Sequence, residues 1–138
     1  MSKHLYRILS IIILILIFTN SLFDADISSS QSGFIVDITN TILGWFNLSI
    51  EINTLSLMIR KLAHFLEFFA LGFTLAKGWG LKVFWNIIII LLVASFDESI
   101  QLFSEGRAFG LLDIGIDLLG GVIGIYTSKI LLSNKIIN

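Results

Sequence analysis

Residues 83–98 read VFWNIIIILLVASFDE, an uncharged and mostly apolar run of 14 residues followed by Asp97 and Glu98. Residues 68–76 and 118–128 form two further uncharged runs, of 9 and 11 residues. A helix needs roughly 20 apolar residues to cross a bilayer. Each run therefore reaches that length only by including the ionisable residues that flank it.

The flanking ionisable residues predict a polar layer on one side of a membrane. They precede the run at 68–76, follow the run at 83–96 and precede the run at 118–128. Successive membrane-spanning helices run in opposite directions, so these three positions lie on the same side. Ionisable groups inside a membrane are costly and by default indicate a functional site.

The composition indicates an integral membrane protein. Of the 138 residues, 56% are hydrophobic and 14% are charged, and the mean hydropathy is +0.94. A chain with this composition is too apolar to be a soluble domain of this size. The net charge of −1 and the lack of a basic arm predict no nucleic-acid partner. The absence of cysteine excludes disulfides, thiolate metal ligands and a cysteine nucleophile.

A fourth uncharged run covers residues 8–23, and the preceding Lys3 and Arg7 give it the layout of a signal peptide. The next residues, 23–26, read FDAD. They lack the pattern of two small residues separated by one other residue that marks a signal-peptide cleavage site. We therefore expect a retained membrane helix rather than a cleaved signal.

The expected fold is all-α: a single domain of residues 1–138 that forms an integral membrane four-helix bundle. The helices are predicted at about residues 5–23, 57–76, 83–103 and 111–132. Lys and Arg gather at the N-terminus, in the connection 77–82 and in the C-terminal tail. Because positive residues favour the cytoplasmic side, both termini are expected in the cytoplasm, with the polar layer facing outward.

The connection at residues 24–56 is the longest and is expected outside the membrane. Its polar start, residues 28–33, predicts a loop. Residues 34–48 then predict an amphipathic helix, because apolar side chains recur at helical spacing. These apolar residues are Ile35, Ile38, Ile42, Trp45 and Phe46. Such a helix either lies in the outer membrane interface or forms a cap packed over the bundle.

Helical spacing places the candidate binding residues on shared helix faces. They are Lys61, His64, Glu67, Asp97, Glu98, Gln101, Asp113 and Asp117, together with Arg107 in the last connection. Gly120 and Gly124 continue the stripe of Asp117, and this small-xxx-small spacing allows close approach of a second helix. The acids and the glycines are thus predicted to share one buried face.

Three motifs occur in order on three predicted helices. They read Lys61-x-x-His64-Phe65-x-Glu67-Phe68, Asp97-Glu98-x-x-Gln101-x-Phe103 with Arg107, and Asp113-x-x-x-Asp117-x-x-Gly120-x-x-x-Gly124. Over about residues 57–124 the chain resembles the VanZ-like family of bacterial membrane proteins. The resemblance implies a multi-pass protein of the bacterial plasma membrane and a part in resistance to the glycopeptide antibiotic teicoplanin. The family usually has Asn where Asp117 stands, so this chain carries an extra acid.

Binding is the first function expected of the polar layer. Apart from the lipid bilayer itself, the expected partner is a lipid-linked envelope precursor or a lipoglycopeptide. Arg107 and Lys61 would meet its phosphate or carboxylate, and the amphipathic helix would admit its acyl chain. The oligomeric state is left open by the sequence.

An enzyme is the alternative function, acting on an envelope lipid or precursor. Its catalytic candidates are His64, Glu67, Asp97, Glu98 and Asp113, which offer acid–base pairs or hard metal ligands. No metal site or cofactor is assigned, because the chain has no His-Glu-x-x-His motif and no phosphate-binding glycine loop. Ion-coupled transport would require oligomers. A purely structural network of salt bridges could also explain the layer.

Overall fold

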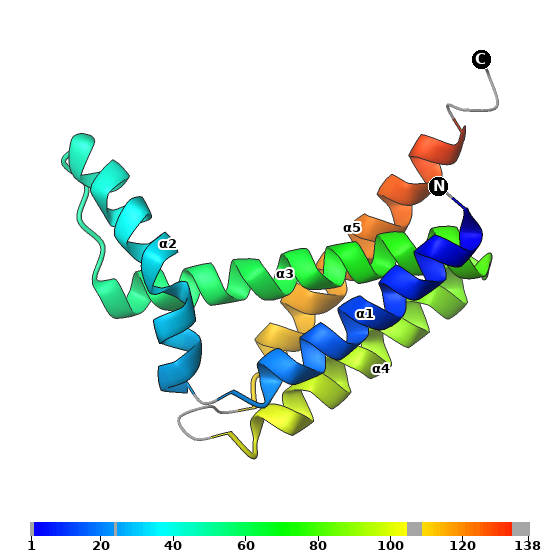
Figure 1. Ribbon diagram of the computed structural model, residues 1–138, viewed down its shortest axis with the longest axis horizontal. Helices are drawn as coiled ribbons and strands as arrows, with labels where there is room; N and C mark the ends of the chain where they lie inside the picture. Colours follow the sequence, from blue (N-terminus) through cyan, green and yellow to red (C-terminus); the bar gives the residue numbers. More distant parts are fainter. Residues whose placement is uncertain (1, 24, 105–108, 134–138) are drawn as a thin grey trace.

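The computed structural model describes residues 2–23, 25–104 and 109–133, with the backbone alone at 25–29, 31–32 and 132–133. These residues form five α-helices and no strand (Figure 1). The helices are α1 (Lys3–Ser21), α2 (Ala25–Trp45), α3 (Ile52–Trp79), α4 (Val83–Gln101) and α5 (Leu111–Ser133). The predicted all-helical class is confirmed, and each of the four expected helices has a counterpart.

Helix α3 is the centre of the molecule. It has 28 residues, which corresponds to a length of about 42 Å at 1.5 Å per residue. It packs against each of the other four helices, α2 beside its N-terminal part and α1, α4 and α5 along the rest (Figure 1). The N-terminus, the α3–α4 connection and the end of α5 lie at one end of the molecule.

Glycines set the closest helix contact, between α3 and α5. A side-chain carbon built on Gly120 would collide with the carbonyl oxygen of Phe65, and one on Gly124 with the carbonyl oxygen of Phe69. On α3, a side-chain carbon on Gly72 would collide with the carbonyl oxygen of Gly121. The predicted glycine stripe therefore lies at a helix–helix contact, where the two backbones are too close for a side-chain carbon to fit between them.

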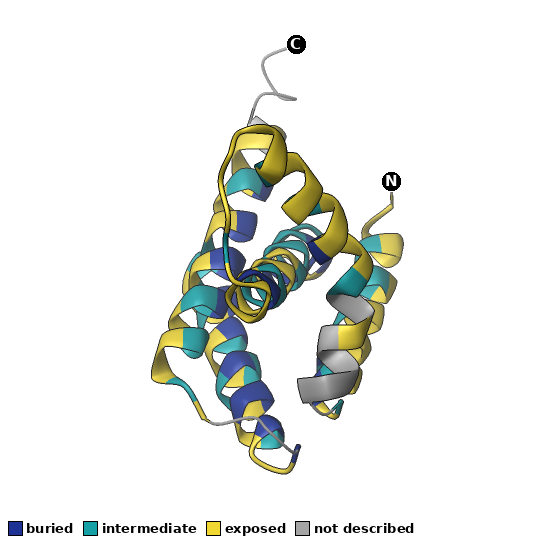
Figure 2. Cartoon of the chain, turned by 90° about the vertical axis from the view of Figure 1, so that its left-hand side faces the viewer, coloured by how far each residue is buried: buried dark blue, intermediate teal, exposed yellow. Residues whose placement is uncertain are grey.

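The core is formed by apolar side chains from four helices. Ile17 of α1, Phe68 of α3, Ile90 of α4 and Ile125 of α5 are fully buried. Large apolar residues also cover the outside of the helices, while the buried residues face the neighbouring helices (Figure 2). An apolar outer surface of this kind suits contact with lipid rather than with water.

Three of the described helices are long and apolar enough to cross a membrane: α1, α4 and residues 111–131 of α5. Helix α3 is outside this set, because Arg60, Lys61, Glu67 and Lys77 interrupt its apolar sequence. The chain therefore has the character of a membrane protein. A fourth span and the cytoplasmic position of both termini stay predictions.

The expected loop at residues 28–33 is wrong, because these residues belong to α2. The polar segment contains no proline, and serine and glutamine are tolerated in a helix that a longer apolar pattern propagates. The amphipathic helix expected at 34–48 therefore begins earlier, at Ala25, and ends at Trp45. Just beyond it, Asn47 has a φ of 55°, a left-handed conformation that terminates helices.

The apolar face of α2 points away from the rest of the protein. Val36 is buried, whereas Ile35, Ile38, Ile42 and Trp45 are exposed. A cap packed over the bundle through this face would bury these four side chains. Their exposure supports the expectation of a helix that lies against lipid.

Contacts near the N-terminus of α1 determine how this helix is aligned along α3. The Nε atom of Arg7 donates a hydrogen bond of 2.9 Å to the carbonyl oxygen of Gly78, and its guanidinium lies 5.4 Å from the Trp79 ring centre. The Trp79 indole donates to Ser10 over 3.1 Å. Because α1 is held here, its other end reaches the middle of α3 and the end of α4.

Candidate functional site

The ends of α1 and α4, the middle of α3 and the start of α5 bring polar side chains together inside the protein. Asp97 of α4 is at the centre and is fully buried. It accepts a hydrogen bond from the Ser21 hydroxyl of α1 and one of 2.9 Å from the Gln101 amide, one turn along α4. Two donors from two helices thus orient the Asp97 carboxylate.

His64 of α3 lies between two carboxylates. Its Nδ1 atom is 3.7 Å from Oε2 of Glu67 and 4.0 Å from Oδ2 of Asp97. The other oxygen of Glu67 accepts a hydrogen bond of 2.6 Å from the Asn20 amide of α1. This arrangement can hold a proton on the imidazole or share it with either carboxylate.

Asn20 and Ser21 were not among the residues assigned from the sequence. The signal that could have identified them is the sequence Thr19-Asn20-Ser21, a polar step at the end of an apolar run. That step lies on the side of the membrane where the polar layer was predicted. Ser104 also contacts the end of α1, because its hydroxyl donates a hydrogen bond of 2.9 Å to the carbonyl oxygen of Ser21.

Asp113 and Glu98 take part in other contacts. Asp113 forms an ion pair with Lys61, in which both side chains are partly exposed. Glu98 is buried and accepts a hydrogen bond of 2.8 Å from the backbone N–H of Gly110, which holds Gly110 against α4. Of the expected residues, Arg107 lies outside the described part of the chain.

Asp117 is the acid that joins His64 and Asp97. One ligand atom from each of these three residues lies within 4.8 Å of the other two. The Asp117 side chain is only 2% exposed, and within the described residues it makes no hydrogen bond or ion pair. It also experiences the negative charge of four carboxylates, those of Asp97, Glu98, Asp113 and Glu67.

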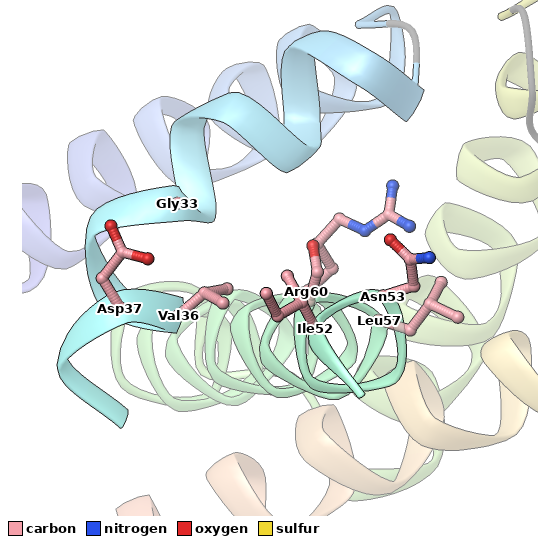
Figure 3. Close-up of a pocket in the computed structure, with 8 residues that line it drawn as sticks. Gly33, Val36, Asp37, Ile52, Asn53, Leu57 and Arg60 are labelled. Atoms are coloured by element: carbon pink, nitrogen blue, oxygen red, sulfur yellow. The ribbon is translucent and has the colours of Figure 1, made fainter. Parts of the chain in front are cut away.

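A cavity of about 300 Å³ lies between α2 and the N-terminal part of α3. Arg60 extends into it from α3, and Asp37 lies on the α2 side (Figure 3). The lining residues are Gly33, Val36, Asp37, Ile52, Asn53, Ser56, Leu57 and Arg60. The cavity could not be predicted from the sequence, since it depends on the angle between two helices.

A model of the VanZ/LLP1 family matches residues 6–132, nearly the whole length of the sequence. The chain belongs to the VanZ/LLP1 family. No curated protein and no solved structure matches it. The resemblance seen in residues 57–124 therefore extends to α1, whose Asn20 and Ser21 contact the buried acids.

Among the described residues of this VanZ/LLP1 protein, the buried ionisable side chains are all acids, namely Asp97, Glu98 and Asp117. His64 lies beside Asp97 and Asp117, whereas Lys61 is paired with Asp113.

Proposed function

We propose that this VanZ/LLP1 protein binds an amphiphilic envelope molecule, a lipid-linked precursor or a lipoglycopeptide, at the outer side of the bacterial plasma membrane. Binding there would contribute to tolerance of teicoplanin. The observation that supports this function is the α2–α3 cavity, which combines polar lining groups with the exposed apolar face of α2 (Figure 3).

The lining of the cavity suits the polar part of such a molecule. The guanidinium of Arg60 matches the geometry of phosphate and carboxylate oxygens. Asn53 and Ser56 add neutral groups that hydrogen-bond, and Asp37 provides a partner for an amine. Lys61, which was expected to meet the phosphate, is instead paired with Asp113 and does not line the cavity.

The apolar part of the molecule would lie along α2. Ile35, Ile38 and Ile42 are exposed on the apolar face of this helix. Each methylene group transferred from water to an apolar surface contributes about 0.8 kcal/mol. An acyl tail that is even partly inserted would therefore add several kcal/mol of binding energy, whereas a ligand without a tail would gain nothing from this face.

Teicoplanin bears an acyl tail and vancomycin does not, so the two drugs test the proposal. Expression of the chain in a susceptible Gram-positive host should raise the inhibitory concentration of teicoplanin more than that of vancomycin. Arg60→Gln should remove this difference, and the matched control Lys82→Gln, which removes an exposed positive charge outside the cavity, should keep it. Equal tolerance to both drugs, or none with a stably inserted protein, would contradict the proposal.

A second candidate function is a membrane-embedded enzyme that uses acid–base or metal chemistry on an envelope lipid or precursor. The position of His64 within 4.0 Å of the Glu67 and Asp97 carboxylates favours it. General acid–base catalysis requires a group of this type within reach of a reacting proton. Turnover of a phosphate-containing lipid that is lost in His64→Gln and kept in Glu51→Gln would support the enzyme. Wild-type protein without turnover would argue against it.

A further inference from the structure

We propose that His64, Asp97 and Asp117 bind a divalent transition-metal cation between α3, α4 and α5. The three residues belong to three different helices and are far apart in the sequence. Only the tertiary structure brings their ligand atoms within 4.8 Å of one another. None of the three lines the α2–α3 cavity, so this site is separate from the proposed lipid site.

The distances match the requirement of a small cation. Ligand atoms bonded at about 2.1 Å to one ion lie at most about 4.2 Å apart. The longest separation allowed here is 4.8 Å, so an inward movement of roughly half an ångström would complete the three bonds. Rotation about the side-chain torsions of Asp117 and His64 can provide such a movement.

Burial and charge argue independently for a positive occupant. Asp117 is 2% exposed, and within the described chain no hydrogen bond or ion pair satisfies its carboxylate. One of its carboxylate oxygens lies within 4.8 Å of a carboxylate oxygen of Asp97, which is itself fully buried. Two desolvated carboxylates at this separation repel each other strongly, and a divalent cation between them replaces that repulsion with two attractions.

Residues next to the proposed ligands hold them in place by hydrogen bonds, as is usual for metal ligands in proteins. The Ser21 hydroxyl donates to one oxygen of Asp97, and the Gln101 amide donates to the other. Glu67 lies 3.7 Å from Nδ1 of His64, beside the proposed ligands, and is itself held by the Asn20 amide. Hydrogen bonds of this kind orient ligands and typically affect metal affinity by roughly 10–100-fold.

The donor set indicates which cations to expect. One imidazole nitrogen with two carboxylate oxygens suits Mn²⁺, Fe²⁺ or Zn²⁺ better than Mg²⁺ or Ca²⁺, which prefer oxygen alone. Three protein ligands leave coordination positions open for water or for an oxygen of a bound molecule. We therefore choose Mn²⁺ as the probe, because its paramagnetism reports both the amount bound and the ligand atoms.

The test is a titration of the tag-free full chain in detergent micelles with Mn²⁺, followed by electron paramagnetic resonance. Wild-type protein should bind one Mn²⁺ per chain. Asp117→Asn and His64→Gln should each weaken binding by roughly tenfold or more. Glu51→Gln also removes one carboxylate, but from an exposed position, and should leave the affinity unchanged.

A spectroscopic measurement on the wild type makes the test independent of the folding of the variants. His4 and His64 are the two histidines of the chain, and only His64 lies beside buried carboxylates. Spin-echo spectra of the bound Mn²⁺ should show coupling to one imidazole nitrogen. No stoichiometric binding, no nitrogen coupling, or full affinity in folded Asp117→Asn would each overturn the proposed site. The antibiotic experiment above has a different readout, so failure of one proposal is distinguishable from failure of the other.

Discussion

Replacement of Gly124 by alanine should destabilise the protein, whereas the same change at Gly115 should not. Both glycines belong to α5. A side-chain carbon on Gly124 would collide with the carbonyl oxygen of Phe69 and lie 2.9 Å from the backbone nitrogen of Phe73. A carbon on Gly115 would meet nothing within 4 Å. The two variants therefore share their chemistry and differ only in what lies opposite.

The magnitude follows from the nature of the obstructing atoms. Backbone atoms of α3 cannot rotate away as a side chain could, so α5 must move outward along its closest contact. Overpacking of this kind typically costs about 1–3 kcal/mol. Gly115→Ala should instead be neutral or stabilising by up to about 1 kcal/mol, because alanine loses less conformational freedom in a helix.

The displacement should also reach the polar site. Asp117 lies seven residues before Gly124 on the same helix, which is about 10.5 Å along its axis. Movement of α5 away from α3 would separate Asp117 from His64, so Gly124→Ala should also weaken Mn²⁺ binding. Gly115→Ala should not.

The assay is reversible unfolding of the purified chain in mixed micelles of constant composition, with tryptophan fluorescence as the probe. The free energy of unfolding of Gly124→Ala should lie at least about 1 kcal/mol below that of Gly115→Ala. If Gly124→Ala is as stable as Gly115→Ala, the close contact between α3 and α5 does not exist in the membrane protein, and the described helix packing is refuted.

Two further predictions concern orientation and the buried acids. Topology reporters fused after Trp79 and at the C-terminus should be cytoplasmic, and one inserted at residues 46–51 should be external, as the Lys and Arg distribution requires; an external Trp79 reporter would reverse the orientation of the site. Glu67→Gln and Asp97→Asn should each abolish function at near-normal membrane levels, measured by immunoblot of the membrane fraction. Levels that fall in step with function would instead identify the acids as a structural network.

Local sequence patterns did not predict two features of the structure, the first part of α2 and the α2–α3 cavity. Residues 28–33 have the composition of a loop, yet they form the first part of α2. Composition describes each residue's own preference, whereas helix formation is cooperative and continues from the apolar repeat that follows. The α2–α3 cavity has no signal in the sequence, because its polar residues, Asp37, Asn53, Ser56 and Arg60, come from two helices whose relative angle is a tertiary property.

The sequence by itself determined that the chain is all-helical, roughly where α1, α3, α4 and α5 lie, and that a glycine stripe lies on the inner face of α5. Helix α3, Ile52–Trp79, extends beyond the predicted residues 57–76 at both ends. Hydrophobic length and a period of 3.6 residues are local properties, so they can be read from one segment at a time. Only the tertiary structure decided the roles of Asp113 and Asp117, which are four residues apart and share a face of α5. One helical turn is about 5.4 Å, and α5 crosses α3 at an angle. Asp113 therefore pairs with the partly exposed Lys61, whereas Asp117 is buried within 4.8 Å of ligand atoms of His64 and Asp97.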